Sequence, residues 1–156
     1  MGVSGCGKST LAAALAKALG ATLLEGDEYH LPESQAKMRN GIALNDGDRE
    51  PWLNRLGKLL AQCPGDAVLT CSALKHRYRE RLRQCEPALR IVFLEITPAT
   101  AQARVASRSN HLFPAGLVAS QFEALEPPLY EPGVLRVNAE SDLATQVRAA
   151  LEWLED

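Results

Sequence analysis

The stretch Gly2-Val3-Ser4-Gly5-Cys6-Gly7-Lys8-Ser9 matches the pattern G-x-x-x-x-G-K-[ST] at every fixed position. In this pattern the glycines let successive backbone N–H groups turn inward and surround an anion. An amphipathic run over residues 10–19 follows directly, and the N-terminus of the helix that it predicts adds a partial positive charge. The residues that we expect to hold the phosphates of a nucleotide are Gly2, Val3, Ser4, Gly5, Cys6, Gly7, Lys8, Ser9 and Thr10.

Two side chains of this stretch suit the charge of a triphosphate. Lys8 can bridge β- and γ-phosphate oxygens, and the Ser9 hydroxyl can ligate Mg²⁺. The alternative is a glycine-rich turn that carries Lys and Ser by chance, but the helical run that follows directly favours a phosphate loop. The stretch therefore predicts a site for a nucleoside triphosphate with Mg²⁺.

The composition fits a single domain over residues 1–156, because 46% of the chain is hydrophobic and 23% is charged. A net charge of −2 gives no electrostatic reason to expect nucleic acid or an anionic membrane as a partner. Basic residues do gather between His76 and Arg83. We expect them to form a solvated helix face rather than a binding patch.

The sequence also bears on location. No apolar run approaches the ~20 residues that span a bilayer, and no charged-then-apolar leader is found. The four cysteines lack the spacing of a zinc site. Isolated thiols in a chain of this kind indicate a reducing cytoplasm.

Short and long apolar segments alternate along the chain, which predicts βα units around a parallel sheet. We expect strands over residues 21–24, 67–71, 91–96 and 134–137, and helices over residues 10–19, 33–39, 48–62, 75–85, 97–107, 115–125 and 141–154. The third of these helices is expected to begin with Asp48 as its N-cap and Pro51 in its first turn.

A phosphate loop of this type normally follows the carboxyl end of a buried strand, whereas Met1 alone precedes Gly2. We therefore expect the first strand to be truncated and the natural reading frame to begin upstream. An intact-mass measurement of the native protein tests this expectation.

Asp27 directly follows the strand predicted over residues 21–24, and ligands of open α/β sheets gather at such carboxyl ends. A carboxylate there can accept a proton from a substrate hydroxyl and order the water around Mg²⁺; its alternative role is a helix or turn cap. Arg49 could be ion-paired on the surface. Together with Asp27 and Lys37 it instead suggests a site for an anionic, hydroxyl-rich molecule, because Arg pairs bidentately with carboxylates.

With these residues in view, the chain is similar to the gluconate kinase (gluconokinase) family of small P-loop kinases, nearly from end to end. The stretches that carry the resemblance, besides the phosphate loop, are Gly26-Asp27 with His30, Lys37-Met38 with Gly41, Leu44-Asn45-Asp46, Asp48-Arg49, Pro51-Trp52-Leu53, Cys71-Ser72-Ala73-Leu74-Lys75, Tyr78-Arg79, Ser120-Gln121-Phe122 and Leu125-Glu126-Pro127. The stretches around Trp52 and Ser72 are far more specific than the loop.

The resemblance implies a three-layer α/β fold like that of nucleoside monophosphate and shikimate kinases, with a five-stranded parallel sheet and a mobile lid at about residues 105–115. It implies an enzyme that transfers a phosphoryl group from ATP to the 6-hydroxyl of D-gluconate, and it suggests a homodimer. As catalytic residues we predict Lys8, Asp27, Arg104 and Arg108, the two arginines reaching the phosphates as the lid closes. Ser9 and Asp27 are expected to hold Mg²⁺, and the expected gluconate contacts are Asp27, His30, Lys37, Arg49, Ser72 and Lys75.

Two other functions stay open at this point. One is another small-metabolite kinase of the shikimate type, because many polyols with a carboxylate would suit these side chains. The other is a non-catalytic nucleotide-binding regulator, which would be expected to have lost Asp27, Arg49 or the lid arginines. His30 is equally interpretable as a buried structural residue.

Overall fold

The computed structural model describes residues 1–108 and 114–156, and within these ranges it contains four strands. All strand pairs are parallel, and they form two separate two-stranded halves, one of β1 with β2 and the other of β3 with β4. The strands are β1 (Thr22–Glu25), β2 (Ala67–Thr70), β3 (Ile91–Glu95) and β4 (Val134–Asn138). The predicted strand positions are therefore confirmed to within one or two residues.

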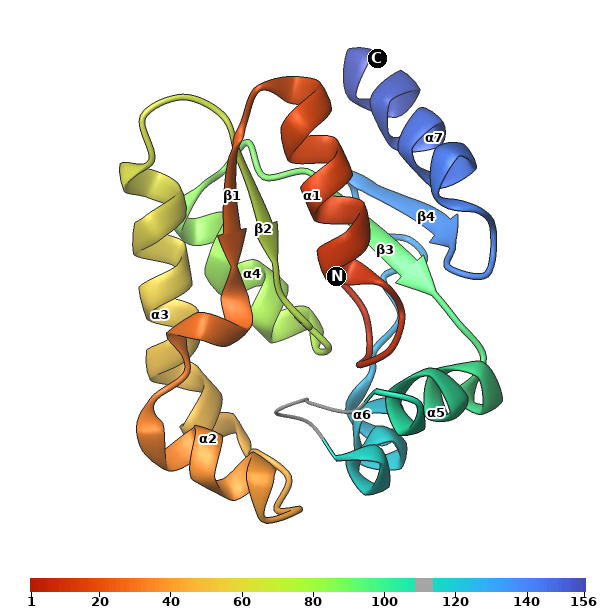
Figure 1. Cartoon of the computed structure of the whole chain (residues 1–156). Helices are drawn as coiled ribbons and strands as arrows, with labels where there is room; N and C mark the ends of the chain where they lie inside the picture. The colour runs from red at the N-terminus through yellow and green to blue at the C-terminus, as the bar shows by residue number, and fades with distance from the viewer. Residues whose placement is uncertain (109–113) are drawn as a thin grey trace.

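Helices connect the strands in the alternating order that the sequence predicts (Figure 1). They are α1 (Lys8–Leu19), α2 (Pro32–Arg39), α3 (Asp46–Gln62), α4 (His76–Cys85), α5 (Pro98–Ala106), α6 (Val118–Ala124) and α7 (Leu143–Glu155), with short 3₁₀ helices η1 (Gly26–Tyr29) and η2 (Ala115–Leu117). Within the described ranges, every helix is too short or too polar to cross a membrane.

Two hydrophobic clusters lie on the two sides of the strands. The first joins α1 to β3, α5 and α7 through residues such as Leu11, Leu94 and Ala150. The second joins α3 to α4 and to the residues that follow β2, and Trp52, Leu56 and others are almost fully buried in it. The predicted three-layer α/β arrangement is confirmed, with α1 and α7 packed together in one helical layer and α3 and α4 in the other.

Met1 and Gly2 lie between the two halves of the sheet (Figure 1). The Met1 amino group donates to the Val92 carbonyl (2.6 Å), and the Met1 carbonyl accepts from Leu94 N–H (3.0 Å). On the other side, Gly2 N–H donates to the Ser72 carbonyl (3.2 Å). Met1 and Gly2 thus join β3 to the segment that follows β2. The expectation about the reading frame stays a prediction.

The start of α3 differs from the prediction. The N-cap is Asn45, not Asp48, and Pro51 lies inside the helix rather than in its first turn. Asn45 and Asp48 form a capping box: the Asn45 side chain accepts from Asp48 N–H (2.8 Å), and the Asp48 carboxylate accepts from Asn45 N–H (3.0 Å). The prediction was wrong because Asp48 acts as the third helical residue of the box, which an acidic residue fills as well as it fills a cap.

The basic stretch of α4 also differs in part from the expected solvated face. Arg77 and Arg81 are exposed as expected, but the Arg79 side chain is only 1% exposed. Its guanidinium donates to the Ala73 carbonyl (2.8 Å) and pairs with the Glu131 carboxylate. Arg79 thus ties α4 to the segment after β2 and to the loop before β4, and the solvated-face prediction is wrong for this residue.

Candidate active site

The loop that precedes α1 has the shape of an anion nest. Gly5 and Gly7 have positive φ angles of 85° and 92°. A Cβ on Gly5 would approach the Ala101 carbonyl to 2.8 Å, so only glycine fits there without a shift. The Lys8 ammonium lies back over the loop and donates to the Gly2 and Val3 carbonyls, each at 3.0 Å. The loop therefore presents backbone N–H groups and one ammonium at the N-terminus of a helix, as an anion site requires.

A carboxylate that the sequence reasoning missed lies next to Ser9. The Ser9 hydroxyl donates to the Glu25 carboxylate (2.9 Å), which also accepts from the Thr70 hydroxyl (2.8 Å). Glu25 is the last residue of β1 and Thr70 the last of β2, so both lie at the carboxyl end of the sheet. The same end-of-strand signal that identified Asp27 applied to Glu25, two residues earlier, and could have found it.

Asp27 lies on η1, just past β1, and His30 is the residue that follows η1. The Asp27 side chain is 77% exposed, and the His30 Nε2 atom is 3.8 Å from its carboxylate. The His30 ring stacks on Trp52 at 4.1 Å between centroids, while the Trp52 indole N–H donates to the Gly26 carbonyl (2.7 Å). Burial lowers the pKa of His30 to about 4, although Asp27 acts in the opposite direction. The imidazole is thus neutral at pH 7 and fixed beside an accessible carboxylate.

Charged side chains from α3 and from the segment after β2 meet around Tyr78. The Tyr78 hydroxyl donates to the Asp46 carboxylate and receives a hydrogen bond from Arg49 (3.4 Å). Asp46 also pairs with Lys75 at 3.1 Å and with Arg77 at 3.2 Å. The structure therefore brings the predicted residues Arg49 and Lys75 together. It places Asp46, Arg77 and Tyr78 beside them, and the sequence did not predict these three as site residues.

The other two predicted gluconate contacts lie in different settings. Lys37 forms an ion pair with Asp48 (2.8 Å), so its charge is matched within the protein. Ser72 follows β2, and its carbonyl accepts from Gly2 N–H, which joins this segment to the phosphate loop. Ser72 is half-buried at that junction.

The two predicted lid arginines differ from each other. Arg104 lies in the last turn of α5 and donates to the Gly5 carbonyl (3.4 Å) and to the Ala139 carbonyl (3.2 Å), so it links the phosphate loop to the loop after β4. Arg108 is exposed and lies beyond the end of α5, so the two do not share a helical face. Residues 109–113 of the predicted lid lie outside the described residues.

Two residues that carried the resemblance without a physical role acquire one in the structure. The Gln121 side-chain oxygen accepts from Ser4 N–H (2.6 Å), so α6 braces the phosphate loop. The Glu126 carboxylate accepts from His76 N–H at the start of α4 (2.7 Å). The Ser4–Gln121 contact joins residues 117 positions apart, and the His76–Glu126 contact joins residues 50 positions apart. Spacing along the sequence could therefore not reveal them.

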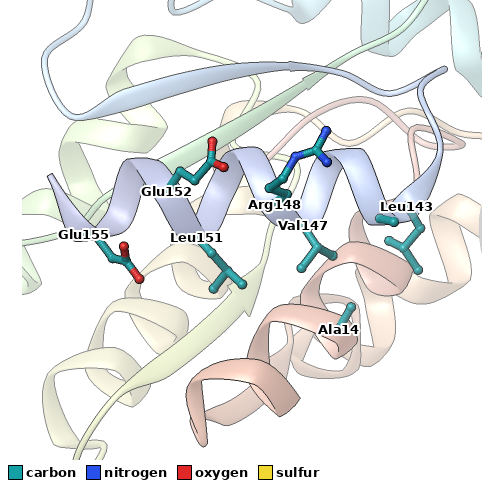
Figure 2. Close-up of a pocket in the computed structure, with 8 residues that line it drawn as sticks. Ala14, Leu143, Val147, Arg148, Leu151, Glu152 and Glu155 are labelled. Atoms are coloured by element: carbon teal, nitrogen blue, oxygen red, sulfur yellow. The ribbon is translucent and has the colours of Figure 1, made fainter.

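A groove outside this region runs between α1 and α7 (Figure 2). Leu143, Val147 and Leu151 make it largely apolar, and Arg148 and Glu152 project from the same helix. Its lining contains none of the predicted site residues. The predicted site residues lie instead near the carboxyl ends of the strands.

A parallel α/β sheet, a glycine-rich loop with Lys and Ser at a helix N-terminus, and carboxylates just past the neighbouring strand together define a P-loop kinase fold. The family described as AAA domain matches residues 1–128 of the chain. A solved APS kinase from Mycobacterium tuberculosis has a TM-score of 0.70 over 100% of this chain and 95% of its own at 20% identity, which shows the same fold.

Closer relatives narrow the class. The chain is 38% identical to the thermosensitive gluconokinase of Escherichia coli strain K12, over 92% of this chain and 79% of that protein. It is 41% identical to the gluconokinase of Gluconobacter oxydans, over 90% and 80% respectively. The crystal structure of a gluconokinase from Sinorhizobium meliloti 1021 has a TM-score of 0.91 and 42% identity, and the match covers 99% of this chain and 89% of that one. The chain belongs to the gluconokinase family.

Proposed function

We propose that this protein catalyses the ATP-dependent phosphorylation of D-gluconate to 6-phospho-D-gluconate. The observation that carries the proposal is the combination of the gluconokinase relatives with a complete set of chemical groups. Three groups come from elements near the carboxyl ends of the strands: the phosphate loop, the accessible Asp27 carboxylate and the cations around Tyr78. This combination supports a kinase over a nucleotide-binding regulator, since a regulator would not need the acceptor groups.

The nucleotide end of the reaction needs charge compensation. Lys8 and the loop N–H groups would hold the β- and γ-phosphates, and Arg104 and Arg108 would approach the transferred phosphoryl group. Ser9 and Glu25 supply neighbouring oxygen donors, with Asp27 acting through water, and such a set suits Mg²⁺, which prefers one or two carboxylates together with substrate phosphates. When bound, Mg²⁺ neutralises negative charge on the phosphates.

The acceptor end needs a base. Asp27 is exposed, so it is available to accept the proton of the attacking hydroxyl or to orient that hydroxyl. His30 is neutral and held against Trp52, with its Nε2 atom 3.8 Å from Asp27, so it lies beside the carboxylate without adding a charge that would compete for the phosphates.

The test is a purified-protein assay with ATP and Mg²⁺, in which ADP release is measured with gluconate, other sugar acids and shikimate. We expect turnover with gluconate well above that with shikimate. Equal or greater turnover of shikimate would favour the other small-metabolite kinase, and ATP binding without any turnover would favour the regulator. A homodimer and a cytoplasmic location stay predictions from the sequence.

A further inference from the structure

Three cations surround the ring of one buried tyrosine. The Arg49 and Arg77 guanidinium carbons lie 5.6 Å and 5.8 Å from the centre of the Tyr78 ring, and the Lys75 ammonium lies 5.8 Å from it. Each of these distances is within the range of a cation–π interaction. Tyr78 itself is only 3% exposed, so it is a fixed platform for the three charges.

The cluster has more positive than negative charge. Asp46 is the carboxylate that pairs with Lys75 and Arg77, and hydrogen bonds from Tyr78 and Lys75 lower the pKa of Asp46, so it is ionised at neutral pH. Arg49 is 8% exposed, and within the described ranges no carboxylate lies in ion-pair range of it. Its guanidinium donates instead to the Tyr78 hydroxyl. Because a buried charge is normally paired, Arg49 is the member of the cluster that indicates an anion from outside the chain.

The cluster also has a definite place relative to the reacting end. Arg49 is close enough to His30 that its charge contributes to lowering the pKa of that residue, and His30 is 3.8 Å from Asp27. Arg49 lies on α3 three positions before Trp52, which stacks on His30, and Arg49 also donates to the Tyr78 hydroxyl. The contacts therefore lead from the Asp27 carboxylate through His30 and Trp52 to the cations at Tyr78. A substrate with a hydroxyl at one end and a carboxylate at the other matches that order.

We infer that the carboxylate of the acceptor substrate binds between Arg49, Lys75 and Arg77 at Tyr78, while its far hydroxyl faces Asp27. The inference rests on the proposed function and adds the orientation of the substrate, the contact with Arg77 and the role of Asp46. Asp46 is a positioning residue: its carboxylate bridges the Lys75 ammonium and the Arg77 guanidinium and leaves Arg49 for bidentate pairing with the ligand.

The discriminating experiment compares gluconate with D-gluconamide, which keeps the hydroxyl chain but carries no charge. Arg77→Gln is the test variant, because Arg77 is 64% exposed and its loss should not disturb folding. Arg81→Gln is the matched control, an exposed arginine one turn further along α4 that contacts Asn54 and Glu50 instead. We expect Arg77→Gln to raise KM for gluconate about tenfold with kcat within about twofold, as the loss of one charged hydrogen bond predicts. The affinity for gluconamide and the behaviour of Arg81→Gln should not change.

Equal effects of Arg77→Gln on gluconate and gluconamide, or equal effects of the two variants on gluconate, would overturn the inference. Asp46→Asn provides a second arm, with the same expected rise in KM for gluconate and little effect on kcat; a fall in kcat alone would contradict the positioning role. Calorimetric titration of the wild-type protein separates this inference from the proposed function. If gluconate binds more tightly than gluconamide but is not turned over, the carboxylate site stands and the kinase activity is rejected. If gluconate is turned over but binds no more tightly than gluconamide, the kinase activity stands and the carboxylate site is rejected.

Discussion

The two ends of the proposed active site are built by different means. The nucleotide end consists of backbone N–H groups and two side chains from eight consecutive residues, braced from outside by Arg104 and Gln121. The acceptor end consists of side chains from η1, α3 and the start of α4, which are brought together by packing around Trp52 and Tyr78. The first end is therefore a local property of the chain, whereas the second exists only when the fold is complete.

The largest effect is expected at Asp27. Asp27→Asn removes the proposed base while keeping the size of the side chain, so kcat should fall about 10²- to 10⁴-fold. Affinity for ATP should be nearly unchanged, because the phosphate loop is not touched. Steady-state kinetics with a nucleotide-binding titration measure both, and Glu28→Gln is the neighbouring exposed control. Full activity of Asp27→Asn would show that the reaction does not use this carboxylate.

The fold on which the acceptor end depends should be sensitive to a residue that is not expected to touch the substrate. Arg79 is buried and holds the Ala73 carbonyl and the Glu131 carboxylate. Partial burial would raise the pKa of Glu131. Hydrogen bonds from Arg79, His76 and Arg83 outweigh the effect of burial and lower that pKa to about 2. Arg79→Met should lower the free energy of unfolding by about 3–5 kcal/mol, since it leaves a partly buried carboxylate without its main partner.

Urea denaturation measures this loss, and the exposed Arg136–Glu95 pair supplies the control. Arg136→Gln should change the free energy of unfolding by less than about 1 kcal/mol, because surface ion pairs contribute little. Similar losses in the two variants would mean that burial of the Arg79 pair does not matter.

His30 gives the acceptor end a pH dependence. Its pKa is about 4 in the folded protein, lowered mainly by burial, against an ordinary value of 6.5. Between these values the unfolded chain binds the proton and the folded protein does not, so the free energy of unfolding falls as pH drops from 6.5 to 4. The decrease in the free energy of unfolding that His30 causes over this pH range reaches up to about 3 kcal/mol. In His30→Gln this part of the slope should vanish in urea titrations over that pH range, and an unchanged slope would assign it to other groups.

The difference between the two ends also explains what the sequence could predict. The order of strands and helices and the phosphate loop follow from local apolar patterns and from a contiguous motif, and the structure confirms them. Asp27 was placed correctly at a strand end by the same reasoning. The burial of Arg79 depends on Glu131, 52 positions away. Tyr78 meets Arg49 and Asp46 across separations of 29 and 32 positions, and no local pattern encodes these contacts.

The smallest effect is expected where the acceptor end does depend on a local signal, at the capping box that begins α3. Asn45 satisfies the Asp48 N–H, and Asp48 in turn holds both Asn45 N–H and the Lys37 ammonium. Asn45→Ala should lower the free energy of unfolding by about 1 kcal/mol, and Asn45→Ser should restore most of it, because serine caps almost as well as asparagine. Asp46 is the first residue of the same helix, so fraying there should also raise KM for gluconate slightly in Asn45→Ala and not in Asn45→Ser. If stability falls while KM stays constant, the cation cluster keeps its geometry without help from the helix start, and the contacts of Asp46 with Lys75 and Arg77 are sufficient to hold it.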